Sequence, residues 1–524
     1  MSRPADAETI PALLALRHRT APDLPALVTD EATISYAELD DASADLAARL
    51  TGDGVVKGDR VAWLAPNGIE WAVTAYAVWR VGAVLVPLST LLRPPELLAQ
   101  LTTASVTHLL LVPTFRGRSY LDDVEEAAPG LLSTVESGDG HPSAPTLQRV
   151  WTSGQLPEAA APATRVRAME NGVRASDDLV VLFTSGSTGD PKGTIHTHGG
   201  GLRAVAAGLE ARGIGSGERL YIPMPFFWTG GLCGGLLSTL LAGATLLTEA
   251  EPDPDRTLHL LEREQVTLFR GWPDQAAKLA AHPAFAAADL SSLGDASLGA
   301  VLPAERRPAP GARANLFGMT ETFGPYCGDR LDTDLPPDEW GSCGRPFAGI
   351  EVRIAEDGEI CVRGPNLMRG VCGRSRNEVF ASDGWFRTGD RGRLDDAGYL
   401  WYEGRLDDMF KVKGATVYPS EVEAAVRSID DVRQAHVTEV DGEVGALVVT
   451  ALPVTEVEAA TRERLSAFKV PSRWRVTADG GEVPVTATGK VDKAALRTLI
   501  ADSAKTSRGI AERGDPGGVS ADVR

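Results

Sequence analysis

The hydrophobic pattern of the N-terminal part of the chain changes in turn between the period of a helix and that of a strand. Apolar residues at positions 39, 42, 46 and 50 recur at helical spacing. Just before them, Ser35-Tyr36-Ala37-Glu38 has the form of a capping box, in which a hydroxyl and a carboxylate satisfy the first amides of a helix. A short strand is expected over 61–64, a helix over 70–81 and a second strand over 82–87. This alternation predicts an α/β fold with a mainly parallel sheet.

Further along, the pattern divides the chain into regions of different kinds. A buried strand is predicted over 179–183, whereas 128–176 is rich in Pro, Ser, Gly and Ala and is interpreted as a connection between two α/β subdomains, with one short strand near Val150. Apolar alternation over 340–404 predicts a β-rich subdomain. After Pro419, a second capping box from Ser420 to Glu423 opens a smaller α+β unit. We therefore predict domains at 1–404 and 405–504, and a disordered tail at 505–524.

Charge and composition narrow the classes of partner. The formal net charge is −19, which repels phosphate backbones and anionic lipid, so neither nucleic acid nor membrane is expected as a partner. The uncharged stretch from Tyr221 to Thr248 could cross a bilayer, but its prolines and glycines predict a loop, a small-residue helix and a strand in the core. Five cysteines without a C-x-x-C pair favour reduced, buried thiols. No secretory signal is visible, and we expect a cytoplasmic protein.

The segment from Thr184 to Gly193 carries the chemistry of a phosphate-binding loop. It reads Thr-Ser-Gly-Ser-Thr-Gly-Asp-Pro-Lys-Gly and follows the predicted strand directly. Glycines let backbone N–H groups turn towards an anion, hydroxyls add donors, and Lys192 neutralises charge. The loop is not of the Walker type, because Gly193 rather than Ser or Thr follows the lysine. A flexible surface loop is the alternative, but the adjoining strand favours a polyphosphate cradle.

This segment resembles the signature loop of the adenylate-forming superfamily, which comprises acyl-CoA synthetases, peptide-synthetase adenylation domains and luciferases. Further segments match that family's motifs in the family's order along almost the whole chain, so chance is a poor explanation. They lie at 34–39, 58–61, 317–321 (Phe-Gly-Met-Thr-Glu), 341–346, 384–390 (Gly-Trp-Phe-Arg-Thr-Gly-Asp), 404–408 and 486–490 (Thr-Ala-Thr-Gly-Lys). The resemblance implies that 1–404 is an AMP-binding adenylation domain and 405–504 a small, mobile lid domain, most like a standalone acyl-CoA synthetase.

The resemblance also implies how ATP and Mg²⁺ are bound. Glu321 coordinates Mg²⁺ and the Thr320 hydroxyl reaches the α-phosphate, which fits the preference of a hard cation for carboxylate and phosphate oxygens. Asp390 accepts hydrogen bonds from both ribose hydroxyls, and Arg405 contacts the ribose or a phosphate. The β- and γ-phosphates are wrapped by Thr184, Ser185, Gly186, Ser187, Thr188, Gly189 and Lys192. The other implied nucleotide contacts are Gly299, Ala300, Gly318, Met319 and Phe317, which stacks near the adenine.

Catalysis is assigned to Lys490, together with Glu321 and Thr188. When the substrate carboxylate attacks the α-phosphate, negative charge builds up as pyrophosphate leaves, and a lysine at that place stabilises it. The resemblance further implies that Asp407 is the hinge of the mobile domain and that Gly414 lines the tunnel for the thiol donor. In isolation each of these residues is more simply a surface charge or a turn residue, so the roles rest on the surrounding motifs.

The segment expected to form the substrate pocket departs from the family. Trp228 stands where histidine is common, and Trp272 stands where small apolar residues are often found. Phe227, Trp228, Trp272 and Gly318 are assigned to the pocket. Two indoles would narrow it or stack on a ring, and a plain core role for Trp272 is the open alternative. We expect a medium or bulky, apolar or aromatic acid.

The predicted function is ATP-dependent activation of a carboxylic acid to its acyl-adenylate with release of pyrophosphate, then transfer to the thiol of CoA. The first alternative is an adenylating enzyme that passes the acyl group to a separate carrier protein or to a non-thiol nucleophile. The second is a non-catalytic acyl-nucleotide-binding protein. The expected cofactors are therefore ATP, Mg²⁺ and CoA, and the expected assembly is a monomer or a homodimer.

Overall fold

The chain forms two compact units, shown in a computed structural model that describes residues 7–156, 158–185, 191–406, 408–412, 415–465, 467, 469–486 and 490–511. Unit 1 comprises Met1–Arg353, Cys361–Arg387 and Leu394–Trp401, and unit 2 comprises Ile354–Ile360, Thr388–Arg393 and Tyr402–Arg524. The domain bounds of 1–404 and 405–504 remain predictions.

Unit 1 is built on a seven-stranded sheet whose central strands are parallel, as the sequence predicted. Successive residues of a strand face opposite sides, and both sides are buried: Val61 and Trp63 lie in one core cluster, whereas Ala62 and Leu64 lie in another. Only the last two pairs are antiparallel, where β10 joins β9 and β19. The order is β19 (Gly370–Val371), β10 (Pro191–Thr197), β9 (Asp178–Ser185), β4 (Val84–Leu88), β3 (Arg60–Leu64), β5 (His108–Leu111) and β8 (Arg149–Thr152).

A second, five-stranded sheet of unit 1 holds the ends of several candidate site segments. Its order is β13 (Leu268–Phe269), β11 (Arg219–Tyr221), β12 (Thr245–Leu247), β1 (Pro25–Val28) and β2 (Thr33–Ser35). The uncharged stretch has the predicted elements: after β11 come a loop, a small-residue helical segment and β12, of which the helical segment and β12 are mostly buried in the core. The helical segment includes a π-helical turn at Leu232–Leu237, a form that often marks functional sites.

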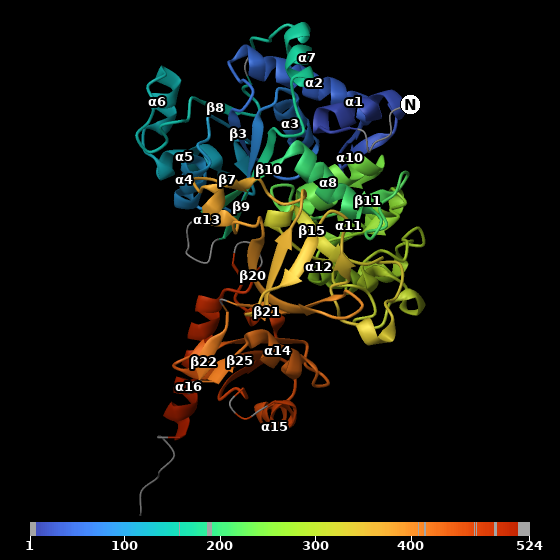
Figure 1. Cartoon of the computed structure of the whole chain (residues 1–524), viewed down its shortest axis with the longest axis vertical. Coiled ribbons are helices and arrows are strands. Elements are labelled where there is room, and N and C mark those ends of the chain that lie inside the picture. The colour runs from blue at the N-terminus through green and yellow to red at the C-terminus, as the bar shows by residue number, and fades with distance from the viewer. Residues whose placement is uncertain are drawn as a thin grey trace, which may run out of the picture. The chain divides into compact units, whose positions relative to one another are not determined.

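The helices of unit 1 cover these sheets in groups (Figure 1). Helices α1, α2, α3 and α7 contact one another, and α4, α5 and α6 form a second group. Their bounds are α1 (Ile10–Thr20), α2 (Tyr36–Gly52), α3 (Ile69–Arg80), α4 (Pro94–Thr103), α5 (Tyr120–Ala127), α6 (Leu131–Ser137), α7 (Ala163–Asn171), α8 (His198–Leu209), α9 (Thr229–Gly231), α10 (Ser238–Ala242), α11 (Pro254–Arg263), α12 (Pro273–Ala280) and α13 (Arg376–Val379).

The two predicted capping boxes have different outcomes. At the start of α2, the Ser35 hydroxyl accepts from the Glu38 amide at 3.2 Å and the Glu38 carboxylate accepts from the Ser35 amide at 2.8 Å, which confirms the first. The second is wrong. Pro419, which has no N–H, occupies the first position of α14 (Pro419–Arg427), so Ser420 already lies inside the helix and Glu423 instead accepts from the Val437 amide.

The region 128–176 is more regular than predicted. The short strand near Val150 is confirmed as β8, but the segment also contains α6 and α7, which the sequence pattern did not predict; its interpretation as a connection between two subdomains stays a prediction. Both helices are short, and each begins without a side-chain cap, after Gly130 and Pro162 respectively. Buried contacts of Leu131, Val135 and Val166 with the core hold them in place, and neither periodicity nor capping signals reveal such contacts in a short segment.

The β-rich region over 340–404 is confirmed by a series of short strands. With the hairpin before it, this region contains β14 (Phe317–Met319), β15 (Gly324–Gly328), β16 (Arg345–Pro346), β17 (Glu351–Ile354), β18 (Glu359–Arg363), β19, β20 (Phe386–Leu394) and β21 (Leu400–Arg405). A separate short hairpin joins β6 (Thr114–Phe115) and β7 (Arg118–Ser119). All five cysteines are buried and none forms a disulfide. Among the described residues, no helix has the length and apolar character needed to span a bilayer.

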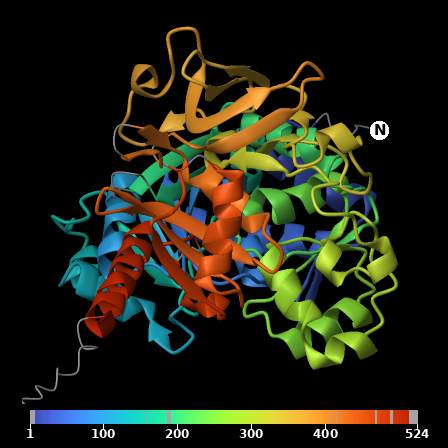
Figure 2. The ribbon, with the colours of Figure 1, turned by 90° about the horizontal axis from the view of Figure 1, so that it is seen from below.

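Unit 2 is a small α+β body, drawn in orange and red (Figure 2). Its three-stranded sheet, in the order β24-β25-β26, packs against α14 and α16. Helix α16 continues through residues 505–511, the first part of the segment expected to be disordered. Besides α14, the elements are β22 (Phe410–Val412), β23 (Ala415–Val417), β24 (Gln434–Val440), β25 (Glu443–Val449), α15 (Val454–Arg464), β26 (Arg473–Thr477) and α16 (Lys493–Ala511).

Candidate active site

The predicted phosphate loop joins β9 and β10 in an antiparallel hairpin. Lys192 pairs with Thr184 across the hairpin, so the lysine and one loop hydroxyl stand at the same level on adjacent strands. Both residues are half-buried. Among the described residues, the Lys192 ammonium has no ion pair and can therefore meet an anion. Gly186, Ser187, Thr188 and Gly189 lie outside the described residues, as does the side chain of Ser185.

The base of this hairpin is fixed by close packing at Gly193. A Cβ atom there would lie 2.9 Å from Val181 Cγ1 and 3.0 Å from Cys372 Sγ, closer than side chains tolerate. The Cys372 amide donates to the Gly193 carbonyl at 2.8 Å, just beyond the pairing of β10 with β19. The glycine after Lys192 therefore serves packing against a neighbouring segment.

His196 links the phosphate hairpin to the predicted metal-binding turn. Its Nε2 donates to the carbonyl of Thr320 at 2.7 Å, and its ring packs on Phe323 with centroids 4.6 Å apart. The side chain is fully buried, and burial lowers the pKa of His196 to about 4, so the imidazole is neutral at neutral pH. Sequence reasoning gave His196 no role. The signal was present: it lies two residues from buried Thr194 on a strand, so both face the interior.

Glu321 lies on the short 3₁₀ turn Thr320–Thr322 that His196 holds. Its carbonyl accepts from the Met368 amide at 2.8 Å, which fixes the backbone. The half-buried carboxylate forms no ion pair among the described residues. A carboxylate in this state fits Mg²⁺, which binds through one or two protein carboxylates together with phosphate oxygens. Glu321 would hold the ion, and the ion would neutralise phosphate charge there.

The hairpin of β14 and β15 places the residues before that turn. The rings of Phe317 and Tyr326 meet edge-on, with centroids 5.5 Å apart. A Cβ on Gly318 would lie 2.1 Å from the carbonyl oxygen of Gly324, so only glycine allows these strands to approach so closely. Met319 pairs with Gly324 and leads into the Thr320 turn. Gly299 and Ala300 lie on a separate 3₁₀ turn, Gly299–Val301, where Ala300 packs on a core cluster.

The aromatic residues assigned to the substrate pocket lie together. The ring centroids of Phe227 and Trp228 are 5.2 Å apart, and those of Trp228 and Trp272 are 5.7 Å apart, both in edge-on geometry. Trp228 and Trp272 are half-buried, whereas Phe227 is buried. The hydroxyl of Thr229, the next residue, donates to the Thr320 hydroxyl at 3.3 Å. The aromatic cluster is thus joined to the turn that carries Glu321.

Asp390 and Arg405, both of unit 2, form an ion pair. Arg405 Nη1 lies 3.2 Å from Asp390 Oδ1 and also donates to the Thr388 carbonyl at 3.0 Å. The Asp390 side chain is 9% exposed, and the Thr388 hydroxyl accepts from its amide. Gly389, at φ +75°, lies close to the guanidinium. The two residues assigned to the ribose therefore belong to one hydrogen-bonded group.

Lys490 lies next to an isolated β-bridge of unit 2. The Thr486 amide donates to the Lys490 carbonyl at 2.7 Å, and Val485 pairs with Val491 in that bridge. The side chain is exposed and has no ion pair among the described residues. The predicted hinge, Asp407, and the predicted tunnel residue, Gly414, lie outside the described residues.

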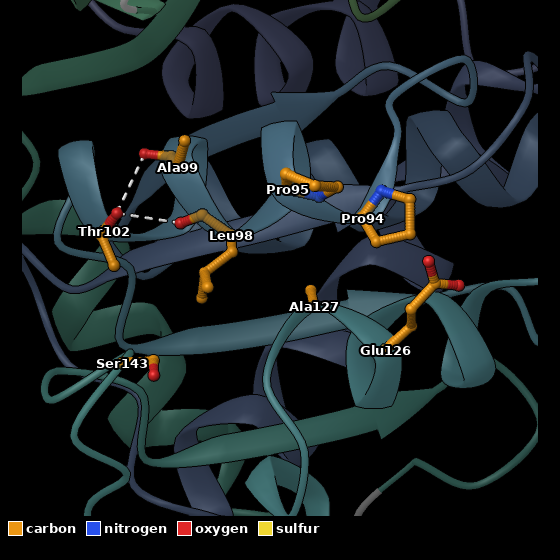
Figure 3. A pocket seen from close by; sticks show the side chains of 8 residues that line it. All are labelled: Pro94, Pro95, Leu98, Ala99, Thr102, Glu126, Ala127 and Ser143. Carbon is orange, nitrogen blue, oxygen red and sulfur yellow. Dashed lines mark hydrogen bonds between the residues drawn. The ribbon is translucent and has the colours of Figure 1, made fainter.

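A separate groove lies elsewhere in unit 1. It lies over α4, α5 and the segment near Ser143, with a volume of about 400 Å³ (Figure 3). The Thr102 hydroxyl at its wall already donates to the carbonyls of Leu98 and Ala99. None of its lining residues belongs to the motifs, so this groove is not the candidate site.

Comparison with known families decides the identity of this arrangement. Residues 15–372 match the family model described as "AMP-binding enzyme". The chain belongs to this family. Among curated relatives of this AMP-binding enzyme, a methyl-dioxo-octahydro-indenyl propanoyl:CoA ligase of Mycobacterium tuberculosis is 36% identical over 94% of this chain and 99% of the relative. A feruloyl-CoA synthase of Amycolatopsis sp is 33% identical over 92% of this chain and 97% of the relative.

Solved structures agree with the fold. The o-succinylbenzoate coenzyme A synthetase of Bacillus subtilis, in complex with ATP and a magnesium ion, superposes with a TM-score of 0.73 at 26% identity, over 93% of this chain and 99% of that chain. An anthranilate CoA ligase in complex with anthranoyl-AMP reaches a TM-score of 0.76 at 22% identity, over 96% of this chain and all of the other (100%).

These findings confirm the predicted superfamily, fold class and reaction type. The protein is an AMP-forming acid–thiol ligase, which activates a carboxylic acid with ATP and Mg²⁺. The roles of individual residues stay predictions. Within unit 1, the structure brings together the phosphate hairpin, the Thr320–Glu321 turn and the aromatic cluster; within unit 2, it brings together Asp390 and Arg405.

Proposed function

We propose that this ligase joins a bulky, ring-bearing carboxylic acid to CoA, and that the β9–β10 loop, Glu321 and Lys490 carry the adenylation step. The observation that supports this most strongly is the hydrogen bond from His196 to the Thr320 carbonyl. It joins β10, the strand of Lys192, to the turn of Glu321, which supports one shared nucleotide site for the ammonium and the carboxylate. Thr229 then connects this group to the aromatic cluster where the acid would lie.

In the first half-reaction, a carboxylate oxygen of the acid attacks the α-phosphorus of ATP. The bond from that phosphorus to the pyrophosphate oxygen breaks, which gives acyl-AMP and pyrophosphate. Lys192 and the loop hydroxyls bind the departing phosphates, and the ammonium of Lys490 stabilises the charge on the reacting oxygens. Glu321 would hold Mg²⁺, which would neutralise phosphate charge there.

In the second half-reaction, the CoA sulfur attacks the acyl carbon. The bond between that carbon and the AMP oxygen breaks, the thiol proton passes to solvent, and a thioester and AMP are released. In this proposal, unit 2 turns about Asp407 between the two steps, and Gly414 leaves room for the pantetheine arm.

The proposed acid class rests on the aromatic cluster and on the relatives. Trp228 and Trp272 present two indole rings with edge-on packing and partial exposure, which suits contact with a flat or fused ring. The names of two relatives, an indenyl propanoyl:CoA ligase and a feruloyl-CoA synthase, also specify ring-bearing acids.

The test measures both half-reactions with the full-length protein. Acid-dependent exchange of labelled pyrophosphate into ATP is expected with phenyl, indolyl and fused-ring alkanoates, at least tenfold faster than with hexanoate. Addition of CoA should then release AMP and thioester in equal amounts. Loss of pyrophosphate exchange for every acid would reject adenylation, and exchange without thioester on CoA would favour the carrier protein or a non-thiol nucleophile.

Two further expectations remain predictions. A cytoplasmic location and a monomeric or homodimeric state are retained from the sequence, and a separate carrier protein stays the alternative acceptor. Sedimentation of the purified protein, with and without acyl carriers, would measure both the assembly and the carrier interaction.

A further inference from the structure

Two arginines meet in the core of unit 1 outside the sequence motifs. Arg212 follows helix α8, and Arg270 follows strand β13. Arg270 Nη2 donates to the carbonyl of Arg212, and the charge of Arg212 acts on Arg270. Arg212 is 6% exposed and Arg270 is half-buried. Among the described residues, neither guanidinium has a carboxylate within ion-pair distance, although the pairing of buried cations is the general rule.

The burial of Arg212 has a structural explanation. Its Nε and Nη2 donate to the carbonyls of Gly208 and Val205 at 3.0 and 3.2 Å, so the cation caps the C-terminal end of α8, where a positive charge is favoured. The thiol of Cys233 faces it, but burial raises the pKa of Cys233, so that thiol is neutral. Arg212 is therefore satisfied in large part by one helix end.

Arg270 has no comparable explanation. Its Nε is buried and has no acceptor among the described residues. Burial and, second, the charge of Arg212 lower the pKa of Arg270 to about 9, so it stays protonated at neutral pH. Asp332 acts on it from a distance, but Arg330 already holds both oxygens of Asp332 at 3.0 and 2.6 Å. A half-buried cation in this state has donor capacity left for an acceptor from outside the fold.

The position of Arg270 points to the acid as the source of that acceptor. Strand β13 runs parallel to β11, and Arg270 stands just beyond its carboxyl end, the edge at which α/β sheets bind ligands. Two residues later comes Trp272, which packs on Trp228. A series of contacts thus runs from Thr320 through Thr229 and the adjacent Trp228 to Trp272, which lies two residues along the chain from Arg270.

We propose that Arg270, positioned by the Arg212 carbonyl, is a specificity-determining residue that donates hydrogen bonds to an oxygen acceptor at the end of the acid remote from its reacting carboxyl. The preferred acid then carries a ring and, beyond it, a carbonyl or a second carboxylate. The planar fork of arginine suits both groups and binds a carboxylate with two parallel bonds. This inference rests on the proposed acid-activating function and adds the polar end of the substrate.

The experiment compares three acids that differ only at the remote end: 3-phenylpropanoates with an ethyl, an acetyl or a carboxyl group at the para position. Pyrophosphate release is measured with the wild-type protein and with Arg270→Met, Arg270→Lys and Arg256→Met. Arg256 on α11 is 56% exposed and serves as the control. We expect the wild type to favour an oxygen-bearing acid over the ethyl acid by about tenfold or more in kcat/KM.

Arg270→Met should abolish that preference, chiefly through a higher KM for the oxygen-bearing acids. Its kcat/KM for the ethyl acid should stay within twofold of the wild-type value. Arg270→Lys should keep part of the preference if the acceptor is a carboxylate and little if it is a carbonyl. Arg256→Met should behave as the wild type. Thermal unfolding and the KM for ATP identify a variant that is merely destabilised, in which case Arg270→Gln replaces Arg270→Met.

An equal loss for all three acids in Arg270→Met, or a wild type without preference, would overturn the inference and leave the ligase function intact. Failure of every acid to cause pyrophosphate release would instead reject the proposed function.

Discussion

Two antiparallel pairings of this molecule each hold a lysine assigned to ATP, and the surroundings of the two lysines differ. Lys192 lies on β10 in the half-buried phosphate hairpin, where Gly193 packs against Val181 and Cys372 at the limit of contact. Lys490 lies beside the bridge between Val485 and Val491, where the described residues show backbone hydrogen bonds from Thr486 to Lys490 and from Asp492 to Pro484, and its side chain is exposed. The first lysine is placed by packing; the second is placed only by the backbone that carries it. Substitutions near the first should therefore change stability and activity together, whereas substitutions at the second should change activity alone.

The largest expected effect is that of Lys490→Ala. We expect adenylation to fall by about a hundredfold or more, roughly 3 kcal/mol, while the melting temperature stays unchanged because the side chain is exposed. Pyrophosphate release measures the first step, and thioester formation from prepared acyl-adenylate measures the second, which should remain within about threefold. Lys493→Ala, at an exposed lysine paired with Asp408 at 2.7 Å, is the matched control. Equal losses in both half-reactions would contradict the assignment.

Glu321→Gln tests a second kind of site group in unit 1. The Glu321 carboxylate forms no ion pair among the described residues, although a hydrogen bond fixes its backbone. We expect adenylation to fall by about a hundredfold at low Mg²⁺, with partial recovery at high Mg²⁺ and with unchanged stability. A magnesium titration of pyrophosphate release measures it. Glu305→Gln, at an exposed position, serves as the control. An unchanged dependence on Mg²⁺ would remove Glu321 from the metal site.

Replacement of His196 tests how much this buried side chain contributes to the free energy of unfolding. Since burial lowers the pKa of His196 from an ordinary value near 6.5 to about 4, the unfolded state takes up a proton first as the pH falls. The stabilisation is complete above pH 6.5 and is lost as the pH falls towards 4, by about 2 kcal/mol between pH 6.5 and 5. Urea unfolding should show a shallower decline for His196→Gln. His198, whose pKa burial also lowers to about 4, keeps a remaining slope in the variant.

His259→Gln, at an exposed residue of α11, is the control for that series. If the free energy of unfolding falls equally with pH in the wild type and in His196→Gln, groups other than His196 cause the decline. Adenylation should fall in His196→Gln as well, because the Thr320 carbonyl loses the donor that holds it.

The smallest effect is expected for Arg405→Met in unit 2. The Asp390 side chain is only 9% exposed and would lose its ion pair. Part of its capacity to orient the ribose would therefore be lost. We expect the KM for ATP to rise about tenfold, which corresponds to roughly 1.4 kcal/mol, with a smaller change in kcat. Arg405→Lys should recover part of the loss. A changed kcat with an unchanged KM would place Arg405 in the chemical step instead.

The sequence predicts this fold well where local signals and packing agree. The capping box at Ser35 and the strands beside it are confirmed, because hydroxyl, carboxylate and apolar spacing point to the same helix start. At Ser420 the same sequence pattern does not form a capping box, because Pro419 occupies the first helical position and Tyr418 is the N-cap residue. In α6 and α7, tertiary contacts replace the missing local signals.

The candidate site divides in a similar way. The sequence identifies one set of candidate residues, because their residue types suit the chemistry and their spacing matches a family: the loop hydroxyls, Lys192, Glu321 and Asp390. His196 and Arg270 are not identified in this way, because their significance depends on their contacts in the fold: a backbone carbonyl 124 positions away for His196, and the backbone carbonyl of a second arginine 58 positions away for Arg270. Such contacts are set by strand order, which a linear pattern does not contain.

The buried thiols give this enzyme internal reporters of motion. Burial raises the pKa of Cys233 in the π-helical turn and of Cys372 beside the phosphate hairpin, so both stay protonated and react slowly with alkylating reagents while their surroundings are closed. A reagent that modifies Cys372 first records the separation of that segment from Gly193, and one that modifies Cys233 records the opening of the turn beside Gly324. The rate at which each thiol is labelled therefore times the opening of two parts of the catalytic unit, without any foreign label.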